Sequence, residues 1–357
     1  MNKENTKRNN GNRLTVYSYG KINLSLDVLG TTEDGYHEVE MILQAIMLHD
    51  DVVIKWEPAG TSCASKAGCD ADAGANCAAD AGCGSGAGAS CDADAGAGAE
   101  PDNKILLHTN LPYVPDDERN IAYKAAALMF ESFPENRGTV KIDIKKRIPV
   151  AAGLAGGSGN GAAVIMGLAK LWGLSLPLED LLELGAKLGS DVPFSVMTQA
   201  ACNGMFGYKG EKMAATCAIA RGRGIYLEPI KALRSWVVLA KPPLSVSTAE
   251  VYKGIDDCII ENHPDNLALA RAIAAQDHAE MKNNMINVLE KYTLHRYYRV
   301  DTLKECLKNN TRNDEIVLMT GSGPTVFSLC RSRQAGKELA GKISSKDAQV
   351  ILTRTLI

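Results

Sequence analysis

The sequence predicts an α+β protein of about two domains, on three observations. Its 357 residues are more than one ordinary hydrophobic core organises. Stretches typical of strands and of helices occur in both halves, without the regular alternation that produces a parallel α/β sheet. A hydrophobic fraction of 45% beside 23% charged residues is that of a globular chain. We place the boundary near residue 195, which gives an N-terminal domain over 13–195 and a C-terminal domain over 196–357.

Strand and helix patterns follow one another along the chain. Alternation of apolar and polar residues predicts strands over 13–29, 36–46, 50–56, 103–109 and 140–148. Apolar residues at helical spacing predict helices over 120–132, 161–172 and 177–189. Asn120 is placed to cap the first helix, and Pro177 with an acidic first turn begins the last. Beyond residue 200, strands are predicted within 235–241, 315–330 and 348–356, with helices between them.

The strands over 50–56 and 103–109 are interpreted as two arms of a hairpin whose tip has grown into an insertion over 59–99. Of those 41 residues, 24 are Ala or Gly, and none is aromatic or a branched aliphatic. The insertion therefore has nothing to bury and is predicted to be disordered. Its five cysteines lie six or eight residues apart, unlike the close pairs of zinc sites. Metal or redox chemistry by these thiols is the less favoured alternative.

Charge, hydropathy and the remaining cysteines exclude several classes of protein. A net charge of −3 gives no reason to expect a nucleic-acid partner, and no apolar run reaches the roughly 18 residues that span a membrane. Residues 1–12 are polar and lack the apolar centre of a secretory signal, so we expect a disordered tail on a cytoplasmic protein. The five cysteines between 202 and 330 are then buried, reduced thiols. A monomer and a homodimer both remain open.

A glycine-rich loop over 149–159 lies between a predicted strand and a predicted helix. Glycine stands at 153, 156, 157 and 159. Bare backbone at the N-terminus of a helix, where N–H groups lack partners and the dipole is positive, is a ready site for phosphate. Ser158 adds a hydroxyl donor or a metal ligand. The spacing matches neither the G-x₄-G-K-[ST] loop of nucleotide triphosphatases nor the dinucleotide G-x-G-x-x-G motif, and a flexible turn with tight helix packing is the alternative.

The segment 149–160 resembles the P-x₃-G-L-[GA]-G-G-S-x-N motif of the GHMP small-molecule kinases. Three more segments are similar to that family's motifs and follow in its order, at 19–46, 188–194 and 319–329. Two short runs are similar to motifs of the branch that acts on a cytidine diphosphate-linked methylerythritol: D-G-Y-H at 34–37 and A-R-G-R-G at 220–224. The resemblance covers nearly the whole chain outside the tail and the insertion. It implies an N-terminal domain like domain 2 of ribosomal protein S5 and a ferredoxin-like C-terminal domain.

The resemblance also implies a reaction and its partners. The family transfers the γ-phosphoryl group of ATP, and this branch places it on the tertiary 2-hydroxyl of the methylerythritol, a small-molecule substrate. Magnesium (Mg2+) is expected with the triphosphate, although the sequence names no acidic ligand for it. The positions that the motif assigns to ATP are Pro149, Val150, Ala151, Ala152, Gly153, Leu154, Ala155, Gly156, Gly157, Ser158 and Gly159.

Asp191 and Lys21 match the catalytic pair of the family. The resemblance implies that Asp191 takes the proton of the acceptor hydroxyl and that Lys21 keeps the carboxylate ionised. Asn23 lies two residues after Lys21, so both side chains share one strand face, where Asn23 is placed to bind the acceptor or the phosphates. From position alone, Asp191 is equally a helix-capping residue and Lys21 a solvated lysine of an edge strand.

Tyr36 and His37 follow the Asp34-Gly35 turn. The resemblance implies that Tyr36 stacks on the cytosine, that His37 hydrogen-bonds its polar edge and that Tyr252 covers the opposite face. A partly exposed loop tyrosine is the alternative for Tyr36.

The glycine loop departs from the family at four positions. Ala151, Ala152, Ala155 and Gly159 stand where the family is richer in glycine or carries a second serine. We expect the alanines to be tolerated provided that their φ angles stay negative. We expect the missing hydroxyl at Gly159 to weaken ATP binding without changing the chemistry.

Two other functions stay as alternatives. Another GHMP kinase, such as a mevalonate or homoserine kinase, is disfavoured by the D-G-Y-H run and the paired tyrosines. A non-catalytic nucleotide-binding regulator is disfavoured because Lys21 and Asp191 are both present.

Overall fold

The structure is a computed structural model that describes residues 11–32, 35–59, 103–312, 315–344 and 346–357. Within these residues it confirms the predicted α+β class, with helices packed on two separate sheets. Asp34, nearly all of the predicted tail, and the predicted insertion beyond Ala59, with its five cysteines, lie outside the described residues.

The first sheet contains six strands: β1 (Arg13–Thr31), β2 (His37–Pro58), β3 (Lys104–Thr109), β4 (Gly138–Lys145), β5 (Cys217–Gly222) and β6 (Tyr226–Pro229). β1 pairs with β2 along nearly its whole length and fills one edge of it. The other edge of β2 pairs with β5 through residues 39–44 and with β4 through residues 51–58. The strands predicted over 36–46 and 50–56 are therefore one continuous strand.

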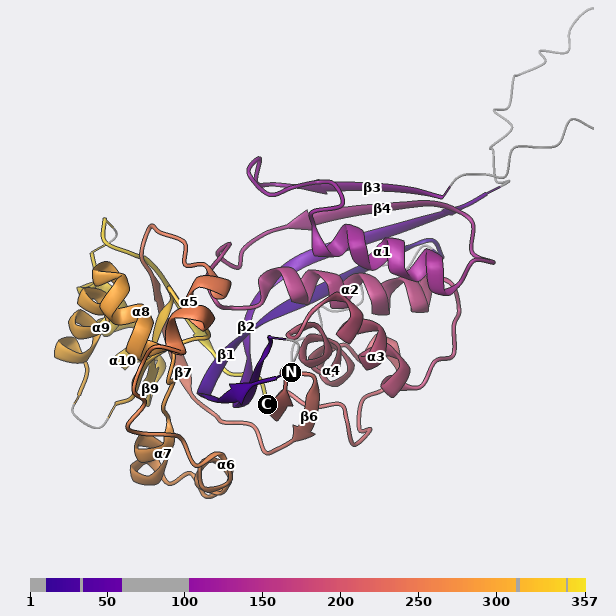
Figure 1. Ribbon diagram of the computed structural model, residues 1–357. Helices are drawn as coiled ribbons and strands as arrows, with labels where there is room; N and C mark the ends of the chain where they lie inside the picture. The colour runs from indigo at the N-terminus through magenta and orange to yellow at the C-terminus, as the bar shows by residue number, and fades with distance from the viewer. Residues whose placement is uncertain (1–10, 33–34, 60–102, 313–314, 345) are drawn as a thin grey trace, which may run out of the picture.

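The predicted hairpin between 50–56 and 103–109 is wrong. β4 pairs antiparallel with β2 and parallel with β3, so it lies between the two expected partners (Figure 1). β4 alternates buried Val140, Ile142 and Ile144 with less buried residues, and it pairs on both sides. The six-residue β3 is short, as edge strands commonly are. β2 and β3 thus follow one another in the chain, on either side of the low-complexity segment, without pairing with each other.

Four helices lie together over one face of this sheet: α1 (Ile121–Ser132), α2 (Gly156–Leu171), α3 (Leu178–Leu188) and α4 (Val192–Cys202) (Figure 1). Asn120 caps α1 as predicted, because its side chain accepts from the Ala122 N–H. α2 begins at Gly156 rather than at the predicted residue 161. A Cβ on Gly161 would lie 2.7 Å from Ile121 Cγ2, so close packing against α1 outweighs the low helix propensity of glycine.

The chain leaves the first sheet late. The boundary predicted near residue 195 falls inside α4, and a short 3₁₀ turn, η1 (Gly204–Phe206), follows that helix. β5 and β6 then return to the first sheet, where β5 pairs with β2. The chain passes to the second sheet only between Pro229 and Trp236.

The second sheet is antiparallel and has the strands β7 (Trp236–Lys241), β8 (Val317–Met319), β9 (Val326–Cys330) and β10 (Gln349–Arg354). Between β7 and β8 come α5 (Thr248–Ile255), α6 (Asn266–Ala275), α7 (His278–Asn284), α8 (Glu290–Arg296) and α9 (Tyr298–Asn310), and α10 (Arg333–Lys342) joins β9 to β10. In chain order the strands lie 4-1-3-2, with helices in both crossovers. This is the split β-α-β arrangement of a ferredoxin-like domain.

The two sheets meet across shared hydrophobic clusters. One cluster joins Leu26 and Met41 of the first sheet to Val238 and Met319 of the second. Backbone hydrogen bonds also tie Leu26 to residues 286 and 288, between α7 and α8. The middle of β1 therefore lies at the junction between the two parts, where the predicted site residues are found.

Candidate active site

Lys21 and Asn23 reach the junction from β1. The pairing of β1 with β2 shifts register on both sides of them, between Tyr19 and Lys21 and between Asn23 and Ser25. Irregularities of this kind re-aim side chains next to active sites. Both residues are buried, and Lys21 Nζ donates to Asn23 Oδ1 at 2.7 Å. The predicted sharing of one strand face by these two side chains is thus seen directly.

Asp191 directly precedes the first residue of α4. It occupies the N-cap position, yet its side chain accepts no capping hydrogen bond, and its Oδ2 lies 3.7 Å from Lys21 Nζ. The side chain is about one-third exposed, whereas that of Lys21 is almost fully covered. The carboxylate thus faces an ammonium group on one side and open space on the other.

The glycine loop packs directly against this pair. The N–H of Lys21 donates to Leu154 O at 3.1 Å, and α2 begins at Gly156. The first intrahelical bond runs from Gly159 N–H to Ala155 O, so the N–H groups of Gly156, Gly157 and Ser158 precede it. These donors at the positive end of α2 can receive an anion, as the sequence predicts.

The structure differs from two expectations about this loop: the condition of a negative φ angle fails at two of the three alanines, and the role expected for position 159 does not fit its place. Ala151 and Ala155 have φ angles of +50° and +54°, in the left-handed region that costs an alanine about 1–2 kcal/mol. Gly159 does not face the loop opening, because a Cβ there would lie 2.6 Å from Ser18 Oγ of β1. A hydroxyl at position 159 would therefore point into the sheet, so glycine is required by packing and removes no phosphate donor.

A second glycine loop, over 319–324, closes the site from the other domain. The backbone N–H of Asn23 donates to Thr320 Oγ1 at 3.1 Å, and the Thr320 hydroxyl lies 3.2 Å from Asn23 Oδ1 and 3.3 Å from Gly153 O. Asn287 Nδ2 donates to Met319 O and to Gly321 O, each at 2.8 Å. The motif at 319–329 had marked this loop in the sequence, but Thr320 and Asn287 were missed, and no local pattern points to Asn287.

A buried polar network supports the other end of the glycine loop. Asp50 of β2 is fully buried and forms an ion pair with Lys146. Its carboxylate also accepts from the backbone N–H groups of Arg147 and Ile148, at 2.6 and 2.8 Å, and from Asn160 Nδ2 at 3.0 Å. One carboxylate thereby fixes the chain before the loop and the helix after it. Sequence reasoning missed this network.

The residues expected at a pyrimidine lie around α5. The rings of His37 and Tyr252 are 5.1 Å apart between centroids, and His37 Nε2 lies 2.7 Å from Asp256 Oδ1. Burial raises the pKa of the Tyr252 hydroxyl, and the negative charge of Asp191 raises it further. At the start of the same helix, Thr248 Oγ1 lies 3.0 Å from Ser322 Oγ of the second glycine loop. Tyr36 is exposed, and the guanidinium carbon of Arg223 lies 3.8 Å from its ring centroid.

Most of the predicted site is thus one cluster in space. Lys21, Asn23 and Asp191 meet the glycine loop, and His37 and Tyr252 continue the cluster toward α5. Tyr36, which precedes His37 in the chain, is exposed and packs against Arg223 instead. In the described part of the chain, no three His, Cys, Asp or Glu side chains come together as a metal site.

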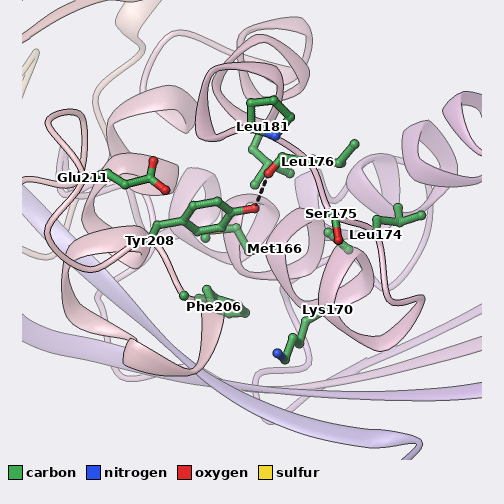
Figure 2. A pocket seen from close by; sticks show the side chains of 12 residues that line it. Met166, Lys170, Leu174, Ser175, Leu176, Leu181, Phe206, Tyr208 and Glu211 are labelled. Atoms are coloured by element: carbon green, nitrogen blue, oxygen red, sulfur yellow. Dashed lines mark hydrogen bonds between the residues drawn. The ribbon is translucent and has the colours of Figure 1, made fainter.

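A cavity of about 410 Å³ lies apart from this cluster, between the end of α2, the start of α3 and the segment after η1 (Figure 2). Leu181 and Phe206 line it, and the Tyr208 hydroxyl donates to Leu176 O at 2.7 Å. It shares no residue with the cluster around Lys21, so we do not assign it to the candidate site. Among the described helices, none combines the length and the apolar character needed to cross a bilayer.

Comparison with known families and proteins gives consistent matches. Residues 120–199 match the family described as GHMP kinases N terminal domain, and residues 269–349 match GHMP kinases C terminal. A 4-diphosphocytidyl-2-C-methyl-D-erythritol kinase of Geobacillus kaustophilus (strain HTA426) is 41% identical over 89% of this chain and 88% of its own length. The enzyme of that name from Alkaliphilus metalliredigens (strain QYMF) is 37% identical over 93% of both chains.

Solved structures share the fold. A crystal structure of 4-(cytidine 5'-diphospho)-2C-methyl-D-erythritol kinase superposes with a TM-score of 0.66 at 24% identity, over 96% of this chain and 99% of that one. A homoserine kinase from Cytophaga hutchinsonii superposes with a TM-score of 0.63 at 13% identity, over 99% and 97%. At these identities the structures establish the two-domain fold.

Proposed function

This chain belongs to the GHMP kinase family, among the 4-diphosphocytidyl-2-C-methyl-D-erythritol kinases, and we propose that it phosphorylates the 2-hydroxyl of 4-diphosphocytidyl-2-C-methyl-D-erythritol with ATP. The products are the 2-phosphate and ADP, in the non-mevalonate route to isoprenoid precursors. The observation that carries the proposal is the Lys21–Asp191 pair beside the N-terminal end of α2.

ATP binds, in this proposal, along residues 149–159. The triphosphate lies against the N–H groups of Gly156, Gly157 and Ser158, which receive its negative charge at the positive end of α2. Mg²⁺ offsets the charge of the phosphates when bound. Among the described residues no three His, Cys, Asp or Glu side chains come together as a metal site, and the Ser158 hydroxyl is the protein group that would hold Mg²⁺ beside the phosphates.

Asp191 acts as the general base. Its partly exposed carboxylate takes the proton of the 2-hydroxyl while the hydroxyl oxygen bonds to the γ-phosphorus and the bond to the β-phosphate oxygen breaks. Lys21, 3.7 Å away, places a positive charge where the transferred group gains negative charge. Asn23 orients the Lys21 ammonium through the 2.7 Å hydrogen bond and is placed to contact the acceptor.

The cytosine lies between aromatic side chains near α5. Tyr36 and Tyr252 offer ring faces, and His37 offers a hydrogen-bonding edge between them. Arg223 already covers one face of Tyr36, so the base stacks on the other face. The Arg223 guanidinium then extends the stack through the tyrosine ring.

The proposal is tested by product formation with three acceptors. The purified protein is supplied with Mg-ATP and either the cytidyl substrate, mevalonate or homoserine, and ADP release and the phosphorylated acceptor are measured. We expect turnover of the cytidyl compound alone, with the Asp191→Asn variant as the control for contaminating kinases. Turnover of mevalonate or homoserine in its place would assign another GHMP activity. No turnover of any of the three acceptors would favour a nucleotide-binding regulator.

A further inference from the structure

Helix α5 holds the His37 ring from two positions. Tyr252 and Asp256 are four residues apart, so they lie on the same face of the helix, with Asp256 at its C-cap. The Tyr252 ring packs on the imidazole at a centroid distance of 5.1 Å and an interplanar angle of 44°. The Asp256 carboxylate meets Nε2 at 2.7 Å, and the His37 side chain is only 12% exposed. Both the position and the rotation of the ring are thereby set.

The helix itself is held firmly to the second domain. Glu250 of α5 accepts from the hydroxyls of Tyr292 and Tyr297, at 3.3 and 2.9 Å. Gly254 lets α5 approach the Tyr292 ring, because a Cβ there would lie 2.0 Å from the ring. Asp256 is therefore carried by a braced element, and the hydrogen bond to His37 links that element to the start of β2.

Asp256 also stands at an unfavourable place for stability. The C-terminal end of a helix carries partial negative charge, so a carboxylate there is disfavoured. A residue that breaks a local rule of this kind is commonly kept for a functional contact. The contact seen here is the hydrogen bond to His37.

The carboxylate of Asp256 decides which nitrogen of His37 carries the proton. An ionised carboxylate only accepts hydrogen bonds, so Nε2 must be the donor, and in the neutral ring Nδ1 is then an acceptor. An acceptor complements the exocyclic amine of cytosine. It opposes the O4 carbonyl that uracil presents at the equivalent position.

We propose that Asp256 is a positioning residue that makes the site select cytosine over uracil, by fixing the tautomer of His37. The inference rests on the proposed function, since it takes the ligand to be a pyrimidine nucleoside diphosphate. Asp256 itself touches no substrate. It acts through the imidazole, as the outer partners of ligating histidines do in other proteins.

Calorimetric binding of CDP and UDP tests this inference without the phosphoryl transfer step. The wild-type protein is expected to bind CDP at least about tenfold more tightly than UDP, the usual worth of one well-placed base contact. In Asp256→Asn, the side-chain amide can donate to Nε2 and permit a proton on Nδ1. The CDP:UDP preference should then fall by on the order of tenfold, mainly through weaker CDP binding.

Asp257→Asn is the matched control, because it removes the same charge from the next residue, which is exposed at the same helix end. It should leave the preference unchanged. A preference that is absent in wild type, or that is the same in Asp256→Asn as in wild type, overturns the inference. Equal weakening of both nucleotides in Asp256→Asn also overturns it and leaves a structural role only. Failure of the proposed function would appear separately, as no phosphorylation of the cytidyl substrate by wild type.

Discussion

Two lysine–aspartate pairs flank the glycine loop, and they differ in how much of the carboxylate is used. Asp50 is fully buried beside Lys146, and its two oxygens also accept from two backbone N–H groups and from Asn160. Asp191 lies 3.7 Å from Lys21, with about one-third of its side chain exposed. Its partner Lys21 instead donates to Asn23 at 2.7 Å.

On the proposed function, the difference separates a pair that supports the structure of the site from a pair that takes part in the reaction. A carboxylate whose lone pairs are all taken cannot accept a proton from a substrate, but it can fix the backbone around it. A carboxylate that is partly open keeps free lone pairs, so it can accept the proton of a substrate hydroxyl. The bare presence of an ion pair would not distinguish the two, whereas the count of hydrogen bonds to each carboxylate does.

The largest expected effect follows from replacing the open carboxylate. Asp191→Asn should lower kcat by roughly 10²–10⁴-fold, the usual contribution of a general base. The Asp191 side chain caps nothing and is partly exposed, and Lys21 keeps its hydrogen bond to Asn23. The midpoint of thermal unfolding should therefore fall less than in Asp50→Asn, and the affinity for ATP should change little. Steady-state kinetics, nucleotide binding and thermal unfolding of the same preparation measure the three quantities.

Asp180→Asn supplies the control, because Asp180 is exposed in the first turn of α3 and is not part of the site cluster. It should keep near-normal turnover. If Asp191→Asn turned over substrate at the wild-type rate, or unfolded at much lower temperature, Asp191 would have the structural role that is assigned here to Asp50.

The second prediction concerns the saturated carboxylate. Asp50→Asn leaves the Lys146 ammonium buried without its counter-charge, which should lower the free energy of unfolding by about 3 kcal/mol. Urea unfolding at neutral pH measures the change. At temperatures where the variant stays folded, kcat should be retained far better than in Asp191→Asn, while KM for ATP rises because the glycine loop is less firmly held.

The neighbouring Asp51 offers a matched comparison. It pairs with Arg147 near the surface, where an ion pair contributes about 0–1 kcal/mol, so Asp51→Asn should cost far less stability than Asp50→Asn. Equal losses in both variants would mean that burial of Asp50 does not set its contribution.

Sequence alone predicted what depends on local pattern. Lys21 and Asn23 share a face because alternate strand residues do, and the strand–loop–helix context identified the N-terminal end of α2 as the proposed phosphate site. Asp191 came only through the family resemblance, since its position alone equally suits a capping role. The α+β class followed from the mixture of patterns in both halves.

Features set by contacts between distant segments could not be predicted from the sequence alone. Thr320 meets Asn23 across 297 residues of chain, and the place of β4 between β2 and β3 depends on pairing that neither strand's pattern encodes. The positive φ angles of Ala151 and Ala155 also depend on contacts with a distant segment. They flank Gly153, where a Cβ would lie 2.5 Å from Thr320 O, so the shape of the loop is set by the other domain.

The smallest expected effect tests the strain within the loop that the two pairs flank. Ala155→Gly should raise the free energy of unfolding by about 1 kcal/mol, because glycine adopts a φ of +54° without the steric cost that alanine bears. Ala274→Gly, at an exposed position of α6, should change stability in the opposite direction by roughly 0.5–1 kcal/mol. Urea unfolding of both variants measures whether the free energy of unfolding rises or falls in each. If Ala155→Gly were destabilising by as much as Ala274→Gly, the left-handed conformation would not be strained in solution, and the Asp50 network would be holding a relaxed loop.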